Sequence, residues 1–147
     1  MKKILITGSC GYLGSVLCGY LQERGYDVAG YDTGFFRDSI LYSPPQTKVT
    51  FKDVRFLEEK DLVGYDALVN LAGISNDPFG NLDLEKIYDP TREYSLTLAK
   101  WCKKLGIRFI FASSCSVYGI GNGDLMTEES PTLPQTGYSL NKKQIED

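Results

Sequence analysis

The chain has 147 residues and a net charge of −3, which fits one domain of ordinary size with no basic stripe for nucleic acid. Its 42 % apolar and 24 % charged residues are typical of a globular protein. Histidine is absent, which excludes a Ser-His-Asp triad, a Cys-His pair and histidine metal ligands within this chain. The four cysteines form no C-x-x-C pair, so we expect no metal site and mostly buried, reduced thiols.

Short apolar runs alternate with helical patterns along the chain. The opening "MKKILITG" has too short an apolar core for a signal peptide, so we interpret it as a strand of a cytoplasmic protein, and no run is long enough to span a membrane. Helical spacing after the first run should end at Gly25, and a helix over about 90–105 should begin at Asp89-Pro90 and end at Gly106. The runs that predict strands are 2–7, 27–31, 48–52, 66–71 and 107–112.

Alternation of strands and helices predicts an α/β fold: a Rossmann-type, doubly wound parallel sheet with helices on both faces. Ligands of such sheets bind at the carboxyl ends of the strands. "TGSCGYLG" follows the first predicted strand, and its G-x-x-G-x-x-G spacing suits a tight turn, close approach of a pyrophosphate and phosphate binding at a helix N-terminus. Asp32, about 20 residues further on, is placed to accept hydrogen bonds from the adenosine ribose, which favours NAD, while nearby Arg37 keeps NADP open.

Two further stretches carry side chains suited to proton chemistry. "FASSCSVYG" places Ser113, Ser114 and Ser116 just after the fifth predicted strand, where serines also serve as turn formers or caps. "YSLNK" places Tyr138 and Lys142 four residues apart, on one face of a helix. Each stretch, taken alone, fits either a functional site or a purely structural role.

Together, these stretches resemble the NAD-dependent sugar epimerase/dehydratase branch of the extended short-chain dehydrogenase/reductase superfamily. The resemblance implies five strands in the order 3-2-1-4-5. Family members have about twice this length, in keeping with a second lobe of domain size. We therefore expect residues 1–147 to be a truncated NAD(P)-binding Rossmann domain, with its C-terminal part and substrate domain missing. The matching pieces, in the family's order, are "TGSCGYLG", Asp32, "DVR" at 53–55, "NLAG" at 70–73, "SSCSVYG" at 113–119 and "YSLNK" at 138–142.

The resemblance also implies a role for each matching residue. Ser114 would be the catalytic serine, Tyr138 the acid/base and Lys142 its partner. A free tyrosine has a pKa of about 10, and the lysine cation and the nicotinamide would lower it by favouring the phenolate. Ser75, Asn76, Ser114 and Ser116 are candidates for substrate contact, although Ser75 and Asn76 could equally form a turn. The implied cofactor-binding residues are Gly8, Cys10, Gly11, Tyr12, Leu13, Gly14, Asp32, Asp53, Val54, Leu71, Ala72, Gly73, Tyr138 and Lys142.

Two departures from the family pattern narrow the expected chemistry. Cys115 and Ser116 stand where the family's dehydratases carry an Asp-Glu pair, which disfavours 4,6-dehydration and leaves epimerisation or keto-sugar reduction. "TREYS" at 91–95 lacks the asparagine frequent in the family's fourth helix. We expect the NAD-binding lobe of a nucleotide-sugar epimerase or related sugar oxidoreductase, homodimeric in the parent protein and with little turnover alone. The alternatives are an NADP-dependent keto-sugar reductase and a non-catalytic NAD(P)-binding sensor module.

Overall fold

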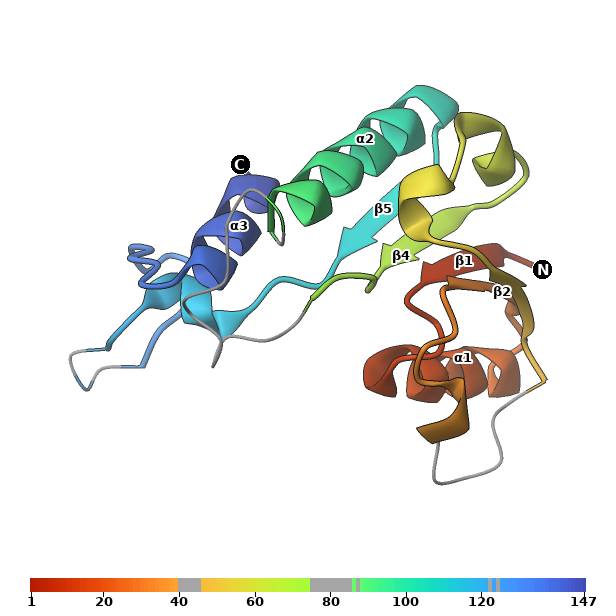
Figure 1. Cartoon of the computed structure of the whole chain (residues 1–147), viewed down its shortest axis with the longest axis horizontal. Coiled ribbons are helices and arrows are strands. Elements are labelled where there is room, and N and C mark those ends of the chain that lie inside the picture. The colour runs from red at the N-terminus through yellow and green to blue at the C-terminus, as the bar shows by residue number, and fades with distance from the viewer. Residues whose placement is uncertain (40–45, 75–85, 87, 122, 124) are drawn as a thin grey trace. The chain divides into compact units, whose positions relative to one another are not determined.

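A single parallel sheet organises the computed structural model of the protein, which describes residues 1–39, 46–74, 86, 88–121, 123 and 125–147. The sheet has the order β3-β2-β1-β4-β5 (Figure 1), as predicted, and all four neighbouring pairs are parallel. No strand end differs by more than one residue from the position predicted from the apolar runs. The strands are β1 (Lys3–Thr7), β2 (Asp27–Asp32), β3 (Lys48–Phe51), β4 (Ala67–Asn70) and β5 (Arg108–Phe111).

Helices connect the strands and follow the last of them. The α-helices are α1 (Tyr12–Glu23), α2 (Asp89–Leu105) and α3 (Gly137–Glu146). Short 3-10 helices are η1 (Arg37–Ser39), η2 (Val54–Phe56), η3 (Glu59–Leu62) and η6 (Cys115–Tyr118). None of the helices within the described ranges is long and apolar enough to cross a membrane.

The chain divides into two compact units, and we describe each by itself. The first unit comprises Met1–Gly73 and Thr97–Ala112, and so holds the whole sheet, α1 and the last turns of α2. The second comprises Ile74–Leu96 and Ser113–Asp147, and holds the first turns of α2 together with η6 and α3.

The connections of the sheet determine which face each helix covers. From β1 the chain passes through α1 to β2, and from β4 it passes through α2 to β5, which are steps in opposite directions across the sheet. Because crossovers between parallel strands are almost always right-handed, α1 and the last turns of α2 must cover opposite faces. Figure 1 shows this arrangement, which is the doubly wound architecture predicted from the sequence.

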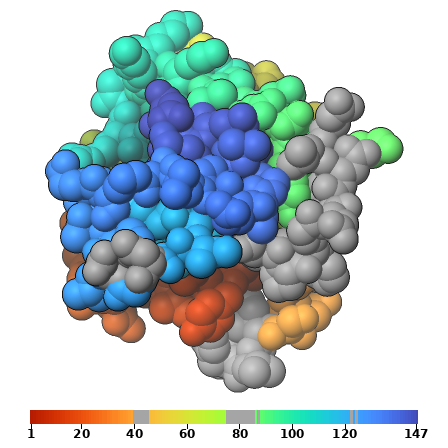
Figure 2. Space-filling view, turned by 90° about the vertical axis from the view of Figure 1, so that its left-hand side faces the viewer, coloured from red at the N-terminus to blue at the C-terminus, as the bar shows by residue number. Residues whose placement is uncertain are grey.

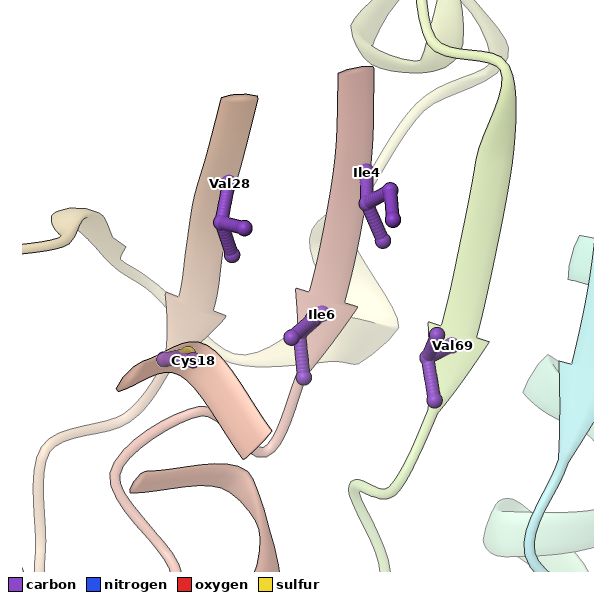
Figure 3. Packing of buried hydrophobic residues seen from close by; sticks show 5 residues of the cluster. All are labelled: Ile4, Ile6, Cys18, Val28 and Val69. Atoms are coloured by element: carbon purple, nitrogen blue, oxygen red, sulfur yellow. The ribbon is translucent and has the colours of Figure 1, made fainter. Parts of the chain in front are cut away.

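Apolar side chains of the central strands and of α1 form the core of the first unit. Figure 3 shows Cys18 of α1 lying over Ile6 and its neighbours on the adjacent strands. Cys18 is 1 % exposed, so it packs as a small apolar residue, and burial is the main cause that raises the pKa of its thiol. The cluster consists of Ile4, Ile6, Cys18, Val28 and Val69.

Glycines end the first two helices in the way the sequence predicted. Gly25 and Gly106 have φ angles of 80° and 70°, in the left-handed region that favours glycine. The N–H of Ile107 donates to the carbonyl of Cys102 at 2.8 Å, and the N–H of Gly106 donates to the carbonyl of Lys103 at 3.4 Å. This pair of bonds is a Schellman motif, which returns the chain from α2 into β5.

In the second unit, a reciprocal cap begins α3. The N–H of Ser139 donates to Oγ1 of Thr136 at 3.1 Å, and the N–H of Thr136 donates to Oγ of Ser139 at 3.0 Å. Asn141 and Ile145 lie four residues apart and are both buried, so this face of α3 points inward. The N–H of Leu133 donates to the carbonyl of Val117 at 3.0 Å, which ties the preceding loop to η6. In Figure 2 the unit's C-terminal residues, drawn in blue, form one continuous surface.

Candidate functional site

The glycine-rich loop after β1 is built by close contacts between backbone atoms. Gly8 has a φ of 74°, and a Cβ there would lie 2.7 Å from the backbone nitrogen of Ala72. A Cβ on Gly14 would lie 2.1 Å from the carbonyl oxygen of Gly8. Gly11 is less constrained, since its Cβ would lie 3.3 Å from the same oxygen and its φ is −76°. Two of the three glycines in the predicted fingerprint are therefore sterically required for the shape of this loop.

The loop leads directly into the N-terminus of α1. No side chain caps this end of the helix, and its first turn contains no acidic residue. The first N–H groups of α1 and the positive end of the helix dipole therefore suit the binding of phosphate. Tyr12 and Leu13, in the same turn, are 83 % and 61 % exposed, which leaves this end of the helix accessible in the structure.

Asp32, at the end of β2, anchors the glycine-rich loop. Its Oδ2 accepts a hydrogen bond from the N–H of Cys10 at 2.9 Å, and its Oδ1 accepts one from the N–H of Gly34 at 2.7 Å. A carboxylate has about four acceptor positions, so two remain for the ribose hydroxyls predicted from the sequence. Burial, with a smaller contribution from Asp32, raises the pKa of the Cys10 thiol, which keeps it protonated near neutral pH.

Two charged residues that follow β2 and β3 each form an ion pair with a nearby residue. Arg37, on which the NADP alternative depends, lies 3.5 Å from the carboxylate of Asp38. Asp53 caps η2 and accepts bonds from the guanidinium of Arg55, the shortest at 2.6 Å from Nη2. These bonds to Arg55 are the main cause that lowers the pKa of Asp53. The role of Asp53 in cofactor binding, like that of Val54, stays a prediction.

Hydrogen bonds join the end of β4 to the end of β1. Oγ1 of Thr7 donates to Oδ1 of Asn70 at 2.7 Å, and both side chains are buried. The N–H of Leu71 donates to the carbonyl of Thr7 at 3.1 Å, and the N–H of Ala72 donates to its Oγ1 at 3.4 Å. The carboxyl edge of the sheet thus brings residues 71–73 beside the glycine-rich loop, as the parallel topology predicts.

Sequence reasoning missed one glycine that the loop requires. A Cβ on Gly30, inside β2, would lie 2.4 Å from Oγ of Ser9, which is itself buried. A side chain at position 30 would therefore displace the loop. The available signal was a glycine in the interior of a strand, which often marks a close approach of backbone or side chain.

In the second unit, the predicted catalytic serine caps η6. Oγ of Ser114 accepts a hydrogen bond from the N–H of Ser116 at 3.2 Å and lies 2.9 Å from the hydroxyl of Ser116. The neighbouring Ser113 hydroxyl donates to a carboxylate oxygen of Glu146 on α3. The element with Ser114 therefore packs against the helix that carries Tyr138 and Lys142. The candidate substrate residues Ser75 and Asn76 lie outside the described residues.

Tyr138 and Lys142 lie one turn apart on α3, as the sequence predicted, and both are half-buried. Nζ of Lys142 lies 5.6 Å from the centroid of the Tyr138 ring, within the range of a cation–π contact. Burial lowers the pKa of Lys142 to about 8, while the Glu146 carboxylate acts in the opposite direction. The side chain is therefore mainly a cation at neutral pH and loses its charge at a moderately alkaline pH.

Comparison with known proteins places this geometry in a family. A UDP-glucose 4-epimerase of Corynebacterium glutamicum is 29 % identical to the chain, over 98 % of the chain and 44 % of that protein. The NAD-dependent NDP-hexosamine 5,6-dehydratase TunA matches 98 % of the chain and 48 % of its own, with 27 % identity and a TM-score of 0.86. The UDP-glucuronic acid 4-epimerase of Bacillus cereus, in complex with NAD, matches 98 % and 50 %, with 27 % identity and a TM-score of 0.79.

The chain thus spans about half the length of each of these proteins. The model of the NAD-dependent epimerase/dehydratase family matches residues 4–147, which is nearly the whole chain. That match agrees with the strand order of the sheet. The chain therefore belongs to the NAD-dependent epimerase/dehydratase family.

Proposed function

We propose that the chain is the NAD-binding and acid–base portion of a nucleotide-sugar epimerase, in which a sugar hydroxyl is oxidised and the resulting ketone is reduced again. The observation that carries this proposal is the Tyr138/Lys142 pair. The lysine is half-buried, lies one turn from the tyrosine and belongs to a helix that packs against the element of Ser114. A silent binding module has no need of this combination.

The residues of the first unit fit NAD. The backbone of the glycine-rich loop and the uncapped start of α1 would hold the pyrophosphate. The close backbone contacts at Gly8 and Gly14, which leave no room for a Cβ, give the loop the shape that this binding needs. Asp32 would accept hydrogen bonds from the adenosine ribose and would repel a 2′-phosphate. When bound, NAD supplies the hydride acceptor and donor.

The residues of the second unit would handle the proton. Tyr138 would take the proton from the sugar hydroxyl during oxidation and return it during reduction. Lys142, charged below a pH of about 8, would favour the phenolate form of Tyr138. Ser114 would donate a hydrogen bond to the sugar oxygen. To do so, its hydroxyl would have to give up the hydrogen bond that it forms with the hydroxyl of Ser116.

Epimerisation is favoured over dehydration for a chemical reason. Removing a neighbouring hydroxyl needs a group that protonates it, and Cys115 and Ser116 provide no carboxylic acid at the two positions after Ser114. The curated relatives include UDP-glucose 4-epimerases, which supports a UDP-hexose as the first substrate to test.

Reduction of bound NAD by a UDP-hexose tests the proposal directly. The epimerase of which the chain is the proposed portion would be loaded with NAD and mixed with UDP-glucose, and the near-ultraviolet absorbance of the reduced nicotinamide would be followed. We expect a signal that Tyr138→Phe abolishes, while calorimetry shows that the variant still binds NAD. Binding of NAD without any reduction by UDP-glucose, UDP-galactose or their N-acetyl forms would overturn the oxidoreductase assignment.

A further inference from the structure

A buried amide lies immediately before Lys142 in the sequence. Asn141 is 4 % exposed, and its Nδ2 donates a hydrogen bond to the backbone carbonyl of Tyr88 at 2.8 Å. Tyr88 directly precedes α2 and is itself 2 % exposed. A buried amide that lost this partner would carry a desolvation penalty, so the bond fixes residue 88 against α3.

The ring of Tyr88 contacts the ring of Tyr138. Their centroids are 6.3 Å apart and their planes meet at 62°, which is the edge-to-face arrangement that aromatic pairs favour. Lys142 lies near the same Tyr138 ring, 5.6 Å from its centroid. The Tyr138 ring is therefore contacted both by a cation from its own helix and by the ring of Tyr88.

We propose that Asn141 and Tyr88 are positioning residues that set the orientation of the Tyr138 ring, with Asn141 fixing the backbone of residue 88 and Tyr88 supporting the ring. This inference rests on the acid–base role of Tyr138 proposed above. The phenol oxygen stands at the far end of the ring, so a small rotation of the ring moves the oxygen away from a substrate hydroxyl. Displacements of about 1 Å can lower a rate by about 100-fold.

The structure offers a matched control on the same two helices. Nη1 of Arg92, in the first turns of α2, donates to Oε1 of Gln144 on α3 at 2.7 Å. This bond also joins α2 to α3, but it is exposed and does not touch Tyr88 or Tyr138. Gln144→Ala therefore removes a link between the helices while leaving the support of the Tyr138 ring in place.

The test compares four variants with wild type, uses Tyr138→Phe for the assignment, and follows a signal that needs no substrate. Protein with ¹³Cζ-labelled tyrosine would be studied by NMR, with the Tyr138 resonance assigned by its loss in Tyr138→Phe. We expect Asn141→Ala and Tyr88→Leu to shift this resonance. Tyr88→Phe, which keeps the aromatic edge, and Gln144→Ala should leave it close to its wild-type position. Thermal unfolding of every variant would show that the compared proteins are folded.

Reduction of bound NAD by UDP-glucose provides the second measurement. We expect Asn141→Ala and Tyr88→Leu to lower the rate constant by about 10- to 100-fold, with the apparent substrate affinity within about 2-fold of wild type. Tyr88→Phe should restore most of the rate. An unmoved Tyr138 resonance in both Asn141→Ala and Tyr88→Leu, or an equal shift in Gln144→Ala, would overturn the positioning role. If wild type reduces no NAD, the proposed function fails, while the NMR result still decides the inference.

Discussion

The two candidate binding regions of the chain are built in different ways. The region around the glycine-rich loop depends on the absence of side chains, because the backbone of residue 72 and that of Gly8 occupy the positions that Cβ atoms would take. The region on α3 depends on individual side chains, each held by a named partner such as the carbonyl of Tyr88. Changes that add atoms should therefore damage the first region most, and changes that remove single polar groups should damage the second.

The largest effect is expected at the phenol of Tyr138. Tyr138→Phe keeps the ring that contacts Tyr88 and Lys142 and removes only the hydroxyl. Because general acid–base groups contribute typically about 10²–10⁴-fold, the rate of NAD reduction by UDP-glucose should fall by that factor. Calorimetry should show that the variant still binds NAD. A rate within about 2-fold of wild type would remove Tyr138 from the mechanism.

The next effect compares two glycines of one loop. Gly14→Ala places a methyl group 2.1 Å from the Gly8 carbonyl, whereas Gly11→Ala places one at 3.3 Å. We expect Gly14→Ala to lower the free energy of unfolding by about 1–3 kcal/mol and to abolish NAD binding. Gly11→Ala should cost clearly less, as measured by urea unfolding and calorimetry. Equal losses would mean that backbone crowding does not determine the shape of the loop.

A smaller effect is expected when Asp32 loses its charge. Asp32→Asn keeps one side-chain oxygen, which can accept one of the two bonds from Cys10 and Gly34. It loses the negative charge that strengthens both bonds. We expect the dissociation constant for NAD to rise about tenfold, which corresponds to about 1.4 kcal/mol. The preference for NAD over NADP should shrink in the same titrations. An unchanged preference would contradict the role of this carboxylate in cofactor choice.

The smallest effect concerns pH and Lys142. Its pKa is about 8 in the folded protein and close to its ordinary value of 10.5 when unfolded. Between these pH values the unfolded chain binds a proton that the folded chain has released, so this group makes the free energy of unfolding rise with pH. Other groups titrate there too, so the quantity to measure is the difference between wild type and Lys142→Met. The free energy of unfolding of wild type minus that of Lys142→Met should increase from pH 8 to 10.5. A constant value across this range would show that Lys142 is not desolvated.

The sequence predicted the elements better than it predicted their contacts. The strands and the two glycine caps follow from local patterns, since apolar runs and left-handed glycines act within a few residues. The bond from Asn141 to Tyr88 joins residues 53 positions apart, and no local pattern indicates it. The close approach of Ser9 to Gly30 likewise depends on how the loop lies across β2.

The site was partly predictable for the same reason. Tyr138 and Lys142 share a helix face because of their spacing alone. By contrast, the resemblance assigned Asp32 only to the ribose, whereas the structure also shows it bonded to the loop through Cys10. This second role depends on backbone N–H groups, which every residue carries and which leave no mark in a sequence.

The two bonds of Asp32 have a consequence for how a dinucleotide binds. Cys10 and Gly34 lie on separate loops, after β1 and after β2, and one carboxylate joins them directly. Both loops are therefore preorganised, and association need not order them from a broad ensemble. Because ordering loops at an interface costs free energy, a cofactor that meets a preformed cradle retains more of its contact energy as affinity.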